Sequence, residues 1–199
     1  MCFQKGVPVD DFPLPGGWAS DVDKENFGPD NQLTHLMCKV PNLKHRLKLL
    51  VCLDRDPSLQ ESITSLVAEA EEIDTKVAAL QLHMLPICGH RTVGICNSYT
   101  EDWANAFFWP GPIEAYSDLF AASFINLCRI SRLSCQHIII SCYTWLGQNT
   151  GDAVALERSL RSGSKAQQLI DEICASVPFH LCPNYIMNGA LSGDLLTSE

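Results

Sequence analysis

The chain has 199 residues, of which 46% are hydrophobic and 19% charged, and its formal net charge at pH 7 is −9. This length suits one domain with loose ends, and the apolar content argues against an intrinsically disordered chain. Affinity for duplex nucleic acid depends on Lys and Arg that neutralise phosphates, so the acidic balance argues against non-specific nucleic-acid binding. A protein partner is compatible with it.

Neither a secretory signal nor a membrane span is predicted. Met1 is followed by a Pro-rich polar run rather than by a charged and then apolar stretch. The wholly apolar runs are only a few residues long, which is far too short to cross a bilayer. We therefore expect a protein that is neither secreted nor membrane-bound, with reduced cysteines.

The ten cysteines do not form a zinc-binding pattern, because no C-x-x-C pair occurs. Cys128, Cys135 and Cys142 recur every seven residues, which places them on one helical face, where we expect small apolar core residues. Four further residues lie near one another without the spacing of tetrahedral zinc ligands: His83, Cys88, His90 and Cys96. We predict neither a metal nor another cofactor.

The first third of the chain predicts a lead-in and then helices. Residues 1–30 contain four prolines and two adjacent glycines without a period, which is typical of an extended segment. A helical pattern begins at Asn31, and Pro41 stops or kinks it because proline lacks the amide proton. The pattern resumes over residues 43–51. It carries a basic cluster, expected to be a solvated helix face or else a phosphate contact: Lys39, Lys44, His45, Arg46 and Lys48.

A long helix is predicted from Asp56 to His83, with Asp56 as its N-cap and Pro57 at its first position. Its apolar residues follow at alternating steps of four and three: Leu59, Ile63, Leu66, Ala70, Ile73, Val77 and Leu80. This spacing is typical of a coiled-coil dimer or of an antiparallel neighbour within the domain. We favour an antiparallel neighbour within the domain, because the apolar helix that follows in the chain must pack against other helices.

That next helix is the centre of the predicted fold. Residues 118–146 contain no Gly or Pro and are dense in apolar side chains, which predicts one long, largely buried helix. Because such a helix must be wrapped by others, we predict an all-α bundle around it. We place Ile130 in its core, so that Ile130→Asp would unfold the domain.

The segments on either side of the central helix complete the prediction. Residues 86–117 form an irregular crossover loop that follows the helix ended by Pro86. After a break at residues 147–151, one helix covers residues 152–161 and Ser164 caps another. The first of them is expected to turn three side chains inward: Val154, Leu156 and Leu160. Residues 184–199 are expected to be a frayed tail, which leaves a helical domain over residues 31–183.

The motif search predicts no enzyme. The sequence contains no G-x-S-x-G, no H-E-x-x-H and no phosphate-binding glycine loop. Residues 162–165 match S-x-x-K, but the companion motifs of serine acylases are missing, so a helix start after a glycine explains them better.

Polar residues on one side of the central helix form the candidate site. Asn126, Arg129 and Arg132, with Gln136 beyond them, step by three or four. Charges on a largely buried helix need partners, so the site is either a structural polar lock or a pocket for an anionic effector. The salt-bridge candidates are Asp118, Asp171 and Glu172.

Several segments resemble the C-terminal regulatory region of fungal zinc-binuclear-cluster transcription factors. They are the Y-x-D step from Tyr116 to Asp118, the N-x-x-R step from Asn126 to Arg129, and the string Glu172, Ile173, Cys174, Ala175, Ser176, Val177, Pro178, Phe179, His180 and Leu181. The resemblance covers roughly residues 33–183. It implies an all-helical region that controls transcription, often in fungal metabolic gene clusters, while a separate six-cysteine module with two zinc ions reads DNA.

This chain has no six-cysteine cluster. The resemblance therefore implies a regulatory module without its own DNA-binding domain, located in the nucleus, or in the cytoplasm when it has no partner. The implied partner is a full-length transcription factor or a second copy of the chain. Because the family region continues through further apolar helices after Leu181, we expect a truncated domain. Two alternatives stay open: an inactive remnant of a truncated gene, and a small-molecule-binding or enzymatic helical domain.

Overall fold

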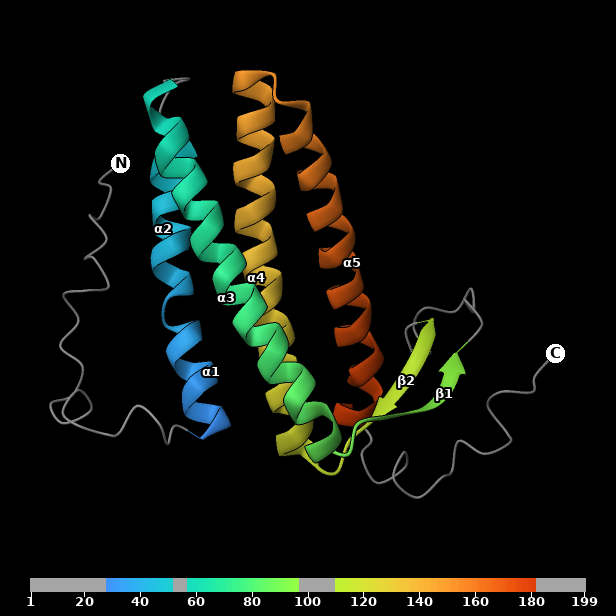
Figure 1. The fold of residues 1–199 in the computed structure, drawn as a ribbon. Helices are drawn as coiled ribbons and strands as arrows, with labels where there is room; N and C mark the ends of the chain where they lie inside the picture. Colours follow the sequence, from blue (N-terminus) through green and yellow to red (C-terminus); the bar gives the residue numbers. More distant parts are fainter. Residues whose placement is uncertain (1–27, 52–56, 97–109, 182–199) are drawn as a thin grey trace, which may run out of the picture.

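The computed structural model describes residues 28–51, 57–96 and 110–181. The helices are α1 (Pro29–Met37), α2 (Val40–Val51), α3 (Gln60–Ile87), α4 (Leu119–Thr150) and α5 (Ala153–Leu181), with a 3-10 turn, η2 (Pro57–Leu59), before α3. Strands β1 (Arg91–Cys96) and β2 (Gly111–Ala115) lie between α3 and α4. The helix α4 stands between α5 on one side and α3 with α1 and α2 on the other (Figure 1). The predicted helical bundle around a long central helix is confirmed.

Parts of the predicted domain plan lie outside the described residues. They are most of the lead-in, the tail and the proposed N-cap Asp56. The limits of the domain therefore stay a prediction. Within the described ranges, no helix is both long and apolar enough to cross a membrane.

Both ends of α4 follow from local chemistry. Asp118 caps the start, where its carboxylate accepts a hydrogen bond from the amide of Ala121 at 2.8 Å. Gly151 ends the helix with φ +70°, a left-handed conformation that glycine adopts without steric cost. The predicted break at Gly147 is wrong: the helix continues through it to Thr150. A Cβ at Gly147 would lie 2.5 Å from Leu156, so glycine lets α5 approach closely.

The buried faces of α3 and α4 match the two predicted periodicities. Cys128, Cys135 and Cys142 are completely buried, and burial raises the pKa of each thiol to about 12. Six of the seven predicted seam residues of α3 are buried, and Leu59 is partly buried against the same core. Because α3 packs on α4 of the same chain, the prediction of an intramolecular neighbour is confirmed.

The placement of Ile130 in the core is wrong, because this side chain is 47% exposed. It lies with Leu127 and His137 on the face of α4 that neither α3 nor α5 covers. A helix with apolar side chains around most of its circumference does not reveal which arc its neighbours leave open. The spacing alone was therefore insufficient to separate Ile130 from Ile138, which is fully buried.

Two further predictions are corrected. The segment 86–117 is not wholly irregular, because β1 and β2 pair antiparallel from Arg91↔Ala115 to Cys96↔Gly111. In addition, α5 is one continuous helix rather than two, and the three side chains predicted to point inward from its first part are exposed. Ala155 and Ser162 are buried there instead. Small side chains at these positions allow α5 to pack closely on α4.

Replacing Ile138 by Ala should lower the free energy of unfolding by about 2–5 kcal/mol, because it removes buried methyl groups and leaves a cavity. Urea denaturation followed by circular dichroism measures this change. The matched control is Ile130→Ala on the exposed face of the same helix, expected to change stability by about 0.5 kcal/mol or less. Equal losses in the two variants would contradict the observed orientation of α4.

Candidate functional site

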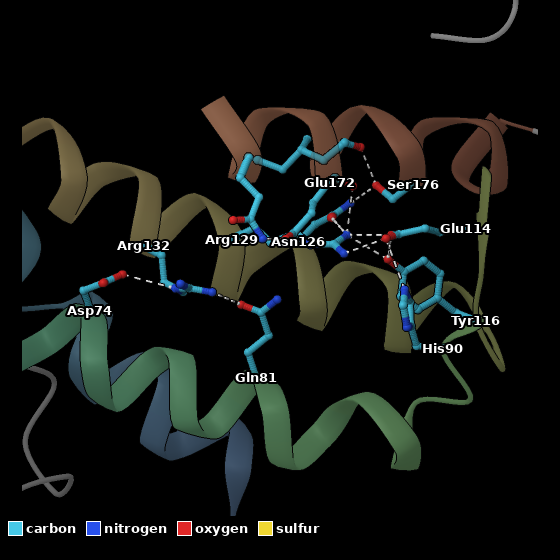
Figure 2. A network of polar contacts seen from close by, with 12 residues as sticks. Asp74, Gln81, His90, Glu114, Tyr116, Asn126, Arg129, Arg132, Glu172 and Ser176 are labelled. Atoms are coloured by element: carbon cyan, nitrogen blue, oxygen red, sulfur yellow. Dashed lines mark hydrogen bonds and ion pairs between the residues drawn. The ribbon is translucent and has the colours of Figure 1, made fainter. Parts of the chain in front are cut away.

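The guanidinium of Arg129 is the centre of a polar cluster that joins three elements (Figure 2). Its side chain is 2% exposed. Nη1 and Nη2 donate to the two carboxylate oxygens of Glu114 on β2, at 2.9 and 3.0 Å. Nε donates to the carboxylate of Glu172 on α5 at 3.1 Å, and Nη1 reaches the backbone carbonyl of Glu172 at 3.0 Å. The paired contact with Glu114 is the planar geometry that makes Arg–carboxylate bonds strong.

Glu114 also contacts Tyr116 and His90. The hydroxyl of Tyr116 donates to its Oε2 at 2.5 Å and accepts from Nη1 of Arg129 at 2.8 Å. Nε2 of His90 lies 3.1 Å from Oε1, an ion-pair distance, although this nitrogen has no well-oriented hydrogen bond to any described atom. Burial on its own would raise the pKa of Glu114, but the contacts with His90, Arg129 and Tyr116 outweigh it and lower the pKa to about 2.

Tyr116 and Arg129, which both contact Glu114, keep their protons. Burial raises the pKa of Tyr116. Burial would lower the pKa of Arg129, but the hydrogen bonds and charge of Glu114 outweigh this effect, so the pKa lies above its usual value. At neutral pH the cluster therefore contains an ionised Glu114, a protonated Tyr116 and a charged Arg129.

Asn126 connects this cluster to the last turns of α5. Its side-chain oxygen accepts from Nη1 of Arg129 at 3.2 Å, and its Nδ2 donates to Oγ of Ser176 at 2.7 Å. The same Nδ2 lies 3.0 Å from Nε2 of His180, whose pKa is lowered by burial. A neutral imidazole has an acceptor nitrogen available for this contact. The ring of Phe179 meets Tyr116 edge-on, with centroids 5.5 Å apart.

Arg132 binds the opposite neighbour, α3 (Figure 2). Its Nε donates to Asp74 at 3.1 Å and its Nη1 to the side-chain oxygen of Gln81 at 3.0 Å. Nε2 of Gln136 donates to the second carboxylate oxygen of Asp74 at 2.9 Å. The two arginines, one turn apart on α4, therefore hold helices on different sides of it.

The predicted salt-bridge partners were right in one case of three. Glu172 binds Arg129, whereas Asp118 caps α4 and Asp171 accepts from Gln167 instead. Sequence reasoning missed Glu114 and Asp74. The available signal was a charge inside an apolar run, since Glu114 stands between Ile113 and Ala115, which are both buried.

The residues of the C-terminal string take different positions in the structure. Those that are buried are Ala175, Ser176, Pro178 and Phe179. Those that are partly buried are Glu172, Ile173, Cys174 and His180. Val177 and Leu181 are exposed. Contacts to α4 or to Tyr116 come from Glu172, Ser176, Phe179 and His180, so the string contributes one side of the cluster.

In this arrangement the cluster has little capacity to bind a ligand. The guanidinium of Arg129 is surrounded by acceptors and has almost no exposed surface. Among the residues that the structure places, no three His, Cys, Asp or Glu side chains gather in a group that could hold a metal.

Comparison with known proteins gives one informative match. The transcription factor dbaG of Emericella nidulans is 31% identical over 77 residues, which are 39% of this chain and 17% of that protein. The chain is similar to a transcription factor. The match spans less than a fifth of that relative's length. No protein family profile and no solved structure matches the chain.

Replacing Arg129 by Met should lower the free energy of unfolding by about 3–5 kcal/mol, because it leaves Glu114 as a buried charge without its main partner. Chemical denaturation measures the loss. The control is Arg161→Met, which breaks an exposed pair with Glu157 and should cost about 1 kcal/mol or less. If both variants unfolded at the same denaturant concentration as the wild type, Arg129 would not hold the bundle together.

The stability should also fall in acid because of Glu114. Its pKa is about 2 in the folded chain, against an ordinary value of 4.5, so below about pH 5 the unfolded chain binds a proton that the folded chain does not. The stabilisation is complete above this range and is lost as the pH falls from about 4.5 towards 2. Wild type and Glu114→Gln should therefore differ most near neutral pH and converge in acid. A constant difference from pH 7 to pH 3 would contradict this assignment.

Proposed function

We propose that this chain is a regulatory module related to transcription factors, and that it acts through protein contacts rather than by catalysis. The observation that carries the proposal is the similarity to transcription factor dbaG over 77 residues. The resemblance of residues 116–118, 126–132 and 172–181 to fungal regulatory regions supports the same assignment.

The geometry of the polar cluster supports a structural role for Asn126, Arg129 and Arg132. Each uses its donors on a neighbouring element, and Arg129 has no exposed face for an effector. General acid–base catalysis works best with a pKa near the working pH, whereas that of Glu114 is about 2. The buried thiols, with pKa values of about 12, are poor nucleophiles. These properties favour a non-enzymatic protein.

The net charge of −9 favours a protein partner over direct contact with DNA. We propose that the partner is a full-length transcription factor or a second copy of this chain, that they meet in the nucleus, and that the regulated genes belong to a fungal secondary-metabolite cluster.

Fusing the chain to a bacterial operator-binding domain tests this function in a fungal reporter strain. We expect the fusion to change reporter expression severalfold relative to the operator-binding domain alone. The fusion that carries Arg129→Met is the control, since loss of the fold should remove the effect at equal protein level. An intact, protease-resistant fusion that leaves expression unchanged would contradict a regulatory role.

A further inference from the structure

A positively charged depression lies away from the Arg129 cluster, where α5 meets α3 and α4. Arg158, Arg161 and Lys165 follow at steps of three and four along α5, so they project from one face. The depression has a volume of about 310 Å³ and is lined by Glu71, Tyr143, Arg158, Arg161, Ser162 and Lys165. Three cations thus face one carboxylate, on a chain whose net charge is −9.

The existing contacts leave much of this positive charge available. The hydroxyl of Tyr143 donates to Glu71 at 3.0 Å and accepts from Arg158 at 3.2 Å. Arg161 pairs with Glu157 at 3.0 Å, but both side chains are about 70% exposed, and such pairs are weak. Lys165 makes no hydrogen bond or ion pair with another described residue. Its ammonium group is free to meet a ligand.

Ser162 supplies an independent observation. It is only 7% exposed, lines the depression, and has no hydrogen-bond partner among the described residues. Helical serines elsewhere in the chain bond to the carbonyl four residues earlier, as Ser131 and Ser141 do at 2.8 and 2.9 Å. The Oγ of Ser162 is not one of the fully buried side-chain atoms without a partner in the described residues, so it keeps contact with the depression and can donate to a ligand there.

We propose that this depression binds the phosphate group of a phosphorylated ligand. A phosphate monoester carries about −1.5 to −2 charges at pH 7, so it is attracted to a surface where three cations outnumber the two carboxylates beside them, Glu71 and Glu157. Arg158, Arg161 and Lys165 neutralise the oxygens, and the hydroxyl of Ser162 donates to one of them. The volume is at the lower end for ligand pockets, so it accommodates a phosphate with a small substituent. This binding is independent of the regulatory function proposed above.

The ligand is either a phosphorylated side chain of a protein partner or a free phosphorylated metabolite. Calorimetric titration at constant ionic strength compares a phosphoserine peptide, its unphosphorylated form, glycerol 3-phosphate and acetate. We expect only the two phosphorylated probes to bind. Tighter binding of the peptide identifies a protein source, and equal or tighter binding of glycerol 3-phosphate identifies a metabolite.

Two variants locate the site. Lys165→Gln and Ser162→Ala should each weaken binding of the better probe, the former by about tenfold as expected for loss of a charged hydrogen bond. Lys48→Gln, which removes an exposed charge on α2, should leave the affinity unchanged. Thermal melts confirm that all three variants stay folded. The proposal is overturned if neither phosphorylated probe binds, if acetate binds equally well, or if Lys165→Gln binds as tightly as Lys48→Gln.

Discussion

The ion pair between Arg129 and Glu114 is the constraint on which the bundle depends. An arginine that is 2% exposed is tolerated only when acceptors surround it, and these come from β2 and α5 as well as from α4 itself. Strand β2 and the residue that follows it bring Glu114 and Tyr116 to the side of α4. Without a carboxylate at that position, Arg129 would keep only Glu172 as an anionic partner, and that carboxylate is more exposed than Glu114.

As a consequence of this constraint, the apolar and the charged residues of α4 have different roles. Its cysteines and aliphatic residues fill the core against α3, while Arg129 and Arg132 determine which neighbour lies on which side. The similarity to a transcription factor fits a domain of this kind. Its interior is specified by contacts rather than by reactive groups, so the partner and ligand that we propose would bind its exposed surface.

Sequence reasoning identified the long helices and the residues at the centre of the cluster, because apolar periodicity and isolated charges are local signals. The central helix and the seam of α3 were predictable in this way, and Glu172 was one of three candidate partners for the two arginines. The exposure of Ile130 and the pairing of β1 with β2, the strand that carries Glu114, were not predicted. Both depend on which elements pack together, and a single sequence does not encode that in local spacing. The break predicted at Gly147 was wrong for the same reason, because this glycine permits close packing of α5 on α4 rather than ending the helix.

The short connection at Gly151 makes α4 and α5 two arms of an antiparallel pair, with contacts spread from Thr144–Ser159 near the turn to Asn126–His180 far from it. These contacts define the register of the pair. A slip of α5 by one helical turn, about 5.4 Å, would move Glu172 out of reach of Arg129 and Ser176 out of reach of Asn126 at the same time. The polar contacts therefore permit a single alignment of α4 and α5, and the close approach of Leu156 to Gly147 is compatible with that alignment.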